Sequence, residues 1–210
     1  MNKVKNLFGN IHMSWLKVII FAVITGVYTG LINQVPFLED TSFRDIAVTY
    51  EWWVLFAIIV VVNCTRSWEA ALKCFVFFLI SQPVVFLVEV PTIGFDKAFY
   101  YYRAFWLTST LLTLPGGFIA YFCKKQNPIG AIILGIGNAI VAVMGVGYVG
   151  AMVAHFPFHL LTTLFCIAEV IITTLCIHKN IRDRIICFAT MAVLTGAGIA
   201  YLLLSGGVLW

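Results

Sequence analysis

Seven long runs of apolar residues follow one another along the chain, separated by short polar stretches. Each run is about 20 residues long, the length that an α-helix needs to cross a lipid bilayer. The runs lack the strict polar–apolar alternation of membrane β-strands. We therefore expect an all-α, polytopic membrane bundle. The predicted spans are residues 14–34, 46–65, 68–90, 98–123, 128–151, 156–178 and 185–208.

The composition agrees with lipid as the main solvent. Of the 210 residues, 62% are hydrophobic and 10% are charged, whereas a soluble domain carries about 25% charged residues. We expect residues 14–210 to form a single transmembrane domain. Residues 1–13 precede it, and there Val4, Phe8 and Ile11 share one helical face, which is typical of an amphipathic helix on a membrane surface.

The basic residues predict the orientation of the bundle. If the N-terminus is cytoplasmic, all of the 13 lysines and arginines except Arg44, Lys97 and Arg103 fall on the cytoplasmic side. Such a bias is expected from the positive-inside rule. Seven spans then place the C-terminus outside, and we expect a multi-pass protein of the cell membrane.

Several helix starts and kinks can also be predicted. Residues 42–45 (Ser-Phe-Arg-Asp) fit a capping box, and Asn127 before a proline fits a helix start. Pro83 and Pro115 lie inside spans, where they should kink or break the helices. Residues 43–50 are only half apolar, so the second span begins with a helix that either lies on the outer leaflet or extends above it.

Ionisable side chains within spans are costly in lipid and are therefore candidates for function. Glu169 lies near the middle of the sixth span, and His155 and His159 begin the same span. His155 and Glu169 fall within about 40° of one helical face, as expected for a proton or cation path. In the alternative interpretation, Glu169 is protonated or hydrogen-bonded across a helix interface and only stabilises the bundle.

Three further polar residues are candidate ligands. Arg103 lies one turn inside the fourth span, where it either binds an anionic group or extends to the outer headgroups. Gln82 precedes a predicted kink, and Asn138 lies mid-span in a glycine-rich helix where an amide can also bridge two helices. If Gln82, Arg103, Asn138 and Glu169 converge, they line one polar cavity, as in transporter sites near the membrane midplane.

Motifs for other functions are missing from the sequence. We find no catalytic, cofactor or nucleic-acid motif, and expect no cofactor and no nucleic-acid partner. The two histidines at 155 and 159 are a weak metal signal, and we predict no metal site. The lipid bilayer is the expected partner, with a small-molecule or ion ligand, or a partner membrane subunit, as further possibilities.

Three function classes remain open at this point. The first is a protein that binds or transports a small solute or ion through a polar cavity open to the outside. The second is a membrane-embedded enzyme acting on a lipid or lipid-linked substrate, using His155, His159 and the outer acids. The third is an accessory subunit that binds its partner through the small-residue faces of the first and fifth helices.

Overall fold

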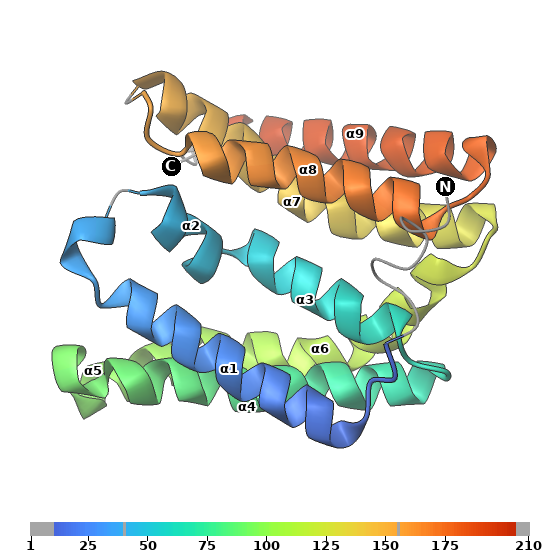
Figure 1. Cartoon of the computed structure of the whole chain (residues 1–210). Helices are drawn as coiled ribbons and strands as arrows, with labels where there is room; N and C mark the ends of the chain where they lie inside the picture. Colours follow the sequence, from blue (N-terminus) through green and yellow to red (C-terminus); the bar gives the residue numbers. More distant parts are fainter. Residues whose placement is uncertain (1–10, 40, 155, 205–210) are drawn as a thin grey trace. The chain divides into compact units, whose positions relative to one another are not determined.

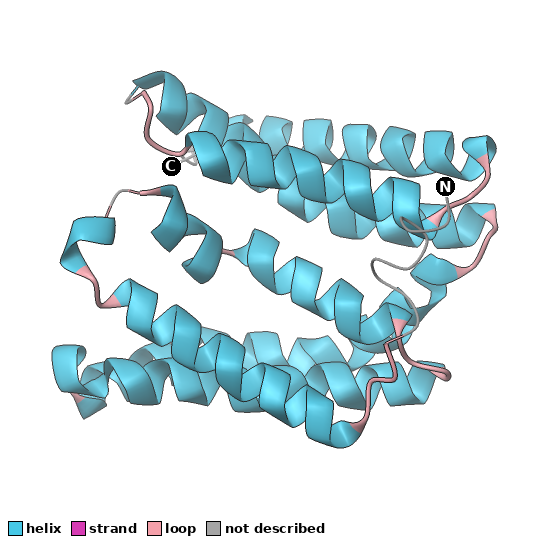
Figure 2. Cartoon of the chain, in the orientation of Figure 1, coloured by secondary structure: helices cyan, strands magenta, loops and turns pink. Residues whose placement is uncertain are grey.

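The computed structural model describes residues 11–39, 41–154 and 156–204, and all regular elements in these ranges are helices (Figures 1 and 2). The α-helices are α1 (Trp15–Asn33), α2 (Ser42–Val48), α3 (Tyr50–Val62), α4 (Ser67–Ile93), α5 (Phe95–Tyr101), α6 (Leu107–Ala120), α7 (Pro128–Ala154), α8 (Leu160–Ile177) and α9 (Ile181–Leu204). Short 3₁₀ turns lie at Pro36–Leu38 and Tyr121–Lys124, and a π-helical segment at Tyr102–Trp106 joins α5 to α6. The all-α prediction is therefore confirmed.

Six helical stretches of the described chain are long and apolar enough to cross a membrane. They are α1, α4, the continuous stretch Phe95–Lys124, α7, α8 and α9. The second predicted span corresponds to α3, whose 13 residues cover only about 20 Å at 1.5 Å per residue. The chain is thus a multi-pass membrane protein, while the count of seven spans and the orientation stay predictions.

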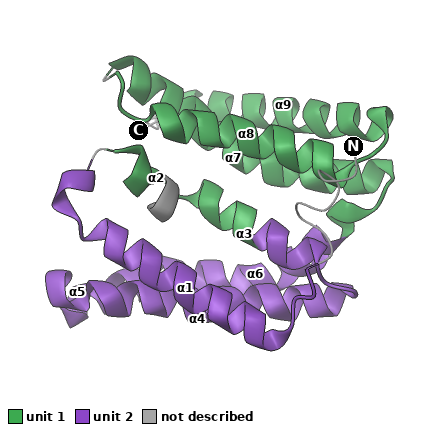
Figure 3. Ribbon diagram, viewed as in Figure 1, with its two compact units in different colours: residues 1–9, 40–56, 122–210 green, residues 10–39, 57–121 purple. Residues whose placement is uncertain are grey.

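The chain divides into two compact units (Figure 3). Unit 1 comprises residues 1–9, 40–56 and 122–210, and unit 2 comprises residues 10–39 and 57–121. Unit 1 therefore contains α2, α7, α8, α9 and the start of α3, whereas unit 2 contains α1, α4, α5 and α6. The boundary lies within α3.

In unit 2, α4 packs against both α1 and α6. Glycine allows the close approach of α1. A Cβ added at Gly26 would lie 2.7 Å from the carbonyl oxygen of Ser81, and one added at Gly30 would lie 2.8 Å from that of Val85. The small-residue face predicted on the first helix is therefore used inside unit 2. Helices α4 and α6 both continue through Pro83 and Pro115, so neither proline breaks its helix.

In unit 1, α7 packs along both α8 and α9, whereas α8 and α9 barely touch each other, and α2 packs on α8. Asn127 caps α7 as predicted, because its Oδ1 accepts a hydrogen bond from the backbone N–H of Gly130 (2.8 Å). Gly135 is another close contact, since an added Cβ would lie 2.8 Å from the carbonyl oxygen of Cys187 on α9. This arrangement leaves one face of α8 available to α2 and to the start of α3.

Candidate functional site

The second predicted span is interrupted at Thr49, between α2 and α3 (Figure 1). Thr49 has extended dihedral angles (φ −93°, ψ 174°), so α2 ends at Val48 and a new helix begins at Tyr50. Helix begins at Ser42 rather than at residue 46, which places Glu51 near the middle of residues 42–62 instead of at the outer end. Broken helices in membrane proteins often place polar groups at the depth where ions and solutes bind.

Glu51 lies in the first turn of α3 and is completely buried (0% exposed). One of its oxygens, Oε1, is hydrogen-bonded to the hydroxyl of Thr49, and the other, Oε2, has no hydrogen-bond partner. The Thr49 hydroxyl also lies 2.5 Å from the carbonyl oxygen of Asp45. The Thr49 hydroxyl, which has a single hydrogen, therefore lies between two oxygen acceptors, one from α2 and one from α3.

Glu169 lies near the middle of α8 and is 4% exposed. Among the described residues, neither of its carboxyl oxygens has a hydrogen-bond partner. Glu169 belongs to the buried face of α8 together with Thr162, Cys166 and Thr173, which recur at helical spacing. Its interaction with Glu51 is electrostatic. The sequence correctly identified Glu169 as a membrane-embedded carboxyl group, but not Glu51 as its neighbour.

Asp45, at the start of this polar region, contacts two side chains of the α8 end. Its Oδ2 lies 2.5 Å from Nδ1 of His159 and 2.9 Å from the hydroxyl of Thr162. The predicted capping box at Ser42 is therefore wrong, because α2 has no side-chain cap hydrogen bond and the carboxylate of Asp45 faces α8 instead. His159 also packs against Tyr148 of α7, with ring centroids 5.6 Å apart.

Tyr148 links this cluster to Glu51. Its hydroxyl is hydrogen-bonded to Thr49, and it interacts electrostatically with both Glu51 and Asp45. We call Asp45, Thr49, Glu51, Tyr148, His159 and Glu169 the polar column of unit 1. The column thus runs from the junction of α7 and α8 to the middle of α8.

Asn138 lies beyond Glu169 and ties three helices together. It is completely buried on α7 and donates a hydrogen bond to the Thr174 hydroxyl of α8 (3.0 Å). The Thr173 hydroxyl lies 3.1 Å from Oδ1 of Asn138, and Cys187 of α9 lies 3.9 Å from Nδ2. These contacts agree with the helix-bridging alternative for Asn138, whereas its role as a ligand stays a prediction.

The opposite end of unit 1 contains a buried histidine, His178, in the connection between α8 and α9. Burial lowers the pKa of His178 below its usual value, although the nearby Asp183 acts in the opposite direction. Both residues are completely buried. Arg184 donates to the backbone carbonyl of His178 (2.8 Å). The sequence analysis selected neither His178 nor Asp183 as a candidate ligand.

The remaining predicted ligands are distributed as follows. Gln82 is buried on α4 of unit 2, and its Nε2 has no hydrogen-bond partner. Arg103 is exposed in the π-helical segment of unit 2, which agrees with the headgroup alternative. His155 lies outside the described residues. The convergence of Gln82, Arg103, Asn138 and Glu169 on one cavity therefore stays a prediction.

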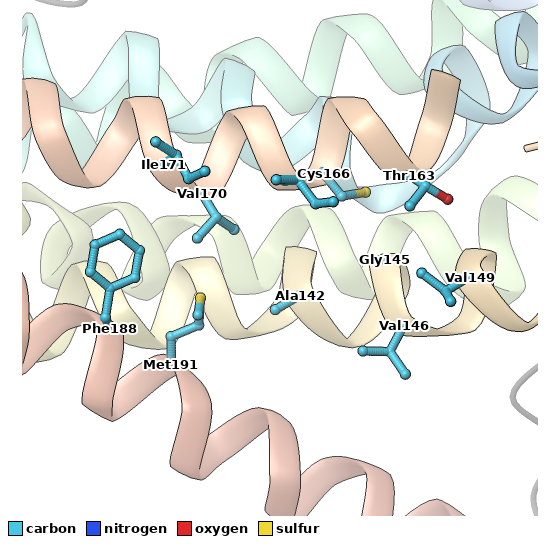
Figure 4. A pocket seen from close by; sticks show the side chains of 11 residues that line it. Ala142, Gly145, Val146, Val149, Thr163, Cys166, Val170, Ile171, Phe188 and Met191 are labelled. Atoms are coloured by element: carbon cyan, nitrogen blue, oxygen red, sulfur yellow. The ribbon is translucent and has the colours of Figure 1, made fainter. Parts of the chain in front are cut away.

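A cavity of about 330 Å³ lies between α7, α8 and α9 (Figure 4). Apart from Thr163 and Cys166, its lining consists of glycine and apolar side chains such as Val146, Phe188 and Met191. Cys166 of the lining also interacts electrostatically with Glu51 and Glu169. This cavity is apolar and so differs from the polar cavity predicted from the sequence.

Two residues of the column, Asp45 and Glu51, were not selected as candidate ligands from the sequence, and Asp45 entered only through the predicted capping box. The half-apolar segment at residues 43–50 was the available signal. Had the second span been extended through that segment, both acids would have fallen inside the membrane region and become candidates.

Neither metal-binding groups nor similarity to known proteins adds to this description of the site. Among residues 11–39, 41–154 and 156–204, no group of three or more His, Cys, Asp or Glu side chains is arranged to hold a metal ion. Comparison with protein-family models, curated proteins and solved structures finds no match to this chain.

Proposed function

We propose that the protein binds and transports a small cation, or a small solute that moves with one, through a polar site in unit 1 that opens to the outside. Glu169 is the central ligand of this site. The observation that supports the proposal is the carboxyl group of Glu169, which is buried in a helix long and apolar enough to span a membrane and has no hydrogen-bond donor on either oxygen within the described part of the chain.

An unpaired carboxylate is expensive at this depth. Burying a charge without a partner costs several kcal/mol, and ionisable groups in spans are rare outside ion and proton pathways. Glu169 therefore binds a proton, a metal cation or an ammonium group whenever it is buried. Since structural carboxyl groups normally have donors, a group with none is better suited to reversible binding than to holding helices together.

The position of Glu169 also supports transport. It lies opposite a broken helix, near a second carboxyl group, Glu51, and broken helices are common at transport sites. The outer opening follows from the predicted orientation, which places Asp45 and His159 on the outer side.

The enzyme and subunit hypotheses have less support. In a nucleophilic enzyme the histidine lies between the nucleophile and the acid, whereas here Asp45 lies between Thr162 and His159. The small-residue face of α1 packs on α4, so that face does not support the binding of a partner subunit.

The test is labelling with a hydrophobic carbodiimide, which reacts with protonated carboxyl groups in apolar surroundings. We expect mass spectrometry of the full-length protein in nanodiscs to find an adduct at Glu169. Labelling should decrease as the pH rises, and a cation that binds the site should protect it. Glu169→Gln cannot form this adduct, and the part of the total labelling that a cation prevents should be absent from this variant.

Glu89 provides a matched control in the same protein. It is a buried membrane carboxyl group of unit 2, but it accepts a hydrogen bond from Asn33 (2.5 Å). We expect its labelling to be insensitive to added cations. If Glu169 is not labelled at any pH between about 5.5 and about 8.5, or if neither pH nor any cation changes its labelling, the proposal is wrong.

A further inference from the structure

We infer that Asp45, His159 and Tyr148 form a proton relay that connects the solution at the α7–α8 junction with Glu51 and Glu169, so that the cation handled by the site is the proton. This inference rests on the proposed function of Glu169. It adds the identity of the ion and a route that the sequence analysis did not contain.

The exposed fractions along the column describe a route from water to the interior. The side chains of His159 and Asp45 are 19% and 15% exposed, whereas Tyr148 is 7% exposed and Glu51 is completely buried. Solvent therefore reaches only the first pair. Any proton that arrives at Glu51 from this side must pass through groups that both accept and donate protons.

Each neighbouring pair in the column is in contact or interacts electrostatically. Asp45 contacts His159 at 2.5 Å and interacts with Tyr148, whose hydroxyl is bonded to Thr49. Thr49 in turn is hydrogen-bonded to Glu51. The column therefore alternates titratable groups with hydroxyl groups, and a hydroxyl can accept one proton while it releases another.

The transfer can be written with its protons balanced. The imidazole of His159 takes up a proton at Nε2 and releases its Nδ1 proton to the carboxylate of Asp45. Asp45 passes that proton to the hydroxyl of Tyr148 and then to that of Thr49, each of which releases its own proton onward. Asp45 and Tyr148 interact electrostatically, and one intervening water is sufficient for transfer between them. Glu51 receives one proton, and Asp45 returns to its starting state. His159 is left with its proton on Nε2 and recovers its starting tautomer when its ring flips. Transfer from Glu51 to Glu169 does not require direct contact, because one intervening water is sufficient for proton transfer.

The groups around Glu51 favour the proton over a metal cation. Glu51 is hydrogen-bonded to the hydroxyl of Thr49, which can pass a proton on, and no cluster in the described part of the chain has metal-binding geometry. Calcium and magnesium are hard cations and need six or more oxygen ligands. Among the described residues, the other titratable groups around the carboxyl pair are the carboxyl group of Asp45, the thiol of Cys166 and the phenol of Tyr148.

The experiment measures proton flux into liposomes that contain the full-length protein, with a pH-sensitive dye inside. A potassium diffusion potential, negative inside, drives the protons. We expect the wild type to conduct protons and Glu169→Gln to be inactive. General acid–base groups typically contribute a hundredfold or more, so His159→Gly and Tyr148→Phe should slow the flux by at least about tenfold.

His159 has a positive φ of 63°, and this determines the choice of variants. Glycine and asparagine both tolerate this conformation, so neither variant strains the start of α8. Added imidazole should restore proton flux in His159→Gly, where it can occupy the space of the missing ring. It should not restore flux in His159→Asn, whose side chain fills that space. A purely structural role of His159 would not produce this difference.

The outcomes separate the relay from the proposed function. The first case is that Glu169 is labelled and that its labelling decreases as the pH rises. If both His159 variants then conduct protons at the wild-type rate, the relay is wrong, but the proposed site at Glu169 is unaffected. The relay is also wrong if the reconstituted protein carries sodium but no protons, or if imidazole has no effect on a slowed His159→Gly. If Glu169 is never labelled, the proposed function itself fails.

Discussion

The acidic side chains of the two units differ in how their burial is compensated. In unit 2, Glu89 accepts a hydrogen bond from Asn33, and Glu69 pairs with Lys73 at 2.5 Å. In unit 1, Glu169 has no donor for either oxygen. A buried acid with donors contributes to packing of the bundle, whereas one without donors is held in place by the rest of the fold and remains free to bind a ligand.

The same contrast extends to the neutral polar groups. The buried side chains of unit 2 that have no partner are uncharged, for example Ser81, Gln82 and Thr110. An unpaired hydroxyl or amide costs far less in lipid than an unpaired carboxylate. Unit 2 can therefore accept these groups as part of its structure, whereas the carboxyl pair of unit 1 calls for a functional explanation.

The comparison is tested most directly by replacing one buried ionisable side chain in each unit. Lys73 of α4 is 4% exposed and contacts the carbonyl oxygen of Met13 as well as Glu69. Lys73→Met leaves both acceptors without their donor, and we expect it to lower the free energy of unfolding by about 3 kcal/mol. Chemical unfolding in detergent, followed by circular dichroism, measures this change.

Glu169→Gln is the matched change in unit 1. Since Glu169 has no hydrogen-bond donor to lose among the described residues, we expect the free energy of unfolding of this variant to be within about 1 kcal/mol of the wild-type value. A loss of stability as large as that of Lys73→Met would show that Glu169 is a structural group, and the contrast between the units would disappear.

The second prediction concerns the packing that holds unit 2 together. Gly26 of α1 has no room for a methyl group, because the added Cβ would lie 2.7 Å from a backbone oxygen of α4. We expect Gly26→Ala to destabilise the protein by about 1–2 kcal/mol. Thermal unfolding in the same detergent provides the measurement.

Gly137 of α7 provides the control for this substitution. An added Cβ at Gly137 meets nothing within 4 Å, and alanine is a better helix former than glycine by about 1 kcal/mol. Gly137→Ala should therefore be neutral or slightly stabilising. Equal effects of the two substitutions would mean that the α1–α4 contact is looser than the structure indicates.

The sequence was sufficient for the fold because hydrophobic runs of membrane length leave few alternatives to helices. It was less informative about the site. Glu169 could be selected because a single acid interrupts an apolar run, but the pairing of Asp45 with His159 joins residues 114 positions apart. A separate helix before the second span was one of two alternatives, but the break at Thr49 itself was not predicted, since threonine also occurs in intact helices.

The last prediction uses the pH dependence of stability to compare the two ends of unit 1. Burial lowers the pKa of His178, so the unfolded chain binds a proton at a higher pH than the folded protein does. The contribution of His178 to stability is therefore complete above the ordinary histidine pKa of about 6.5. It is lost as the pH falls below that value, by at most about 1.4 kcal/mol per pH unit.

Unfolding measured from about pH 7.5 down to about pH 5 should show this loss in the wild type and a smaller one in His178→Gln. The exposed His12 supplies the control, because it has no burial to lose, and His12→Gln should behave as the wild type. Protonation at His178 opposes folding, whereas the proposed relay requires His159 to take up and release protons in the folded protein. If His178→Gln has the same pH dependence of stability as the wild type, the burial of His178 does not oppose its protonation. Proton uptake could then no longer be assigned to the His159 end of unit 1 alone.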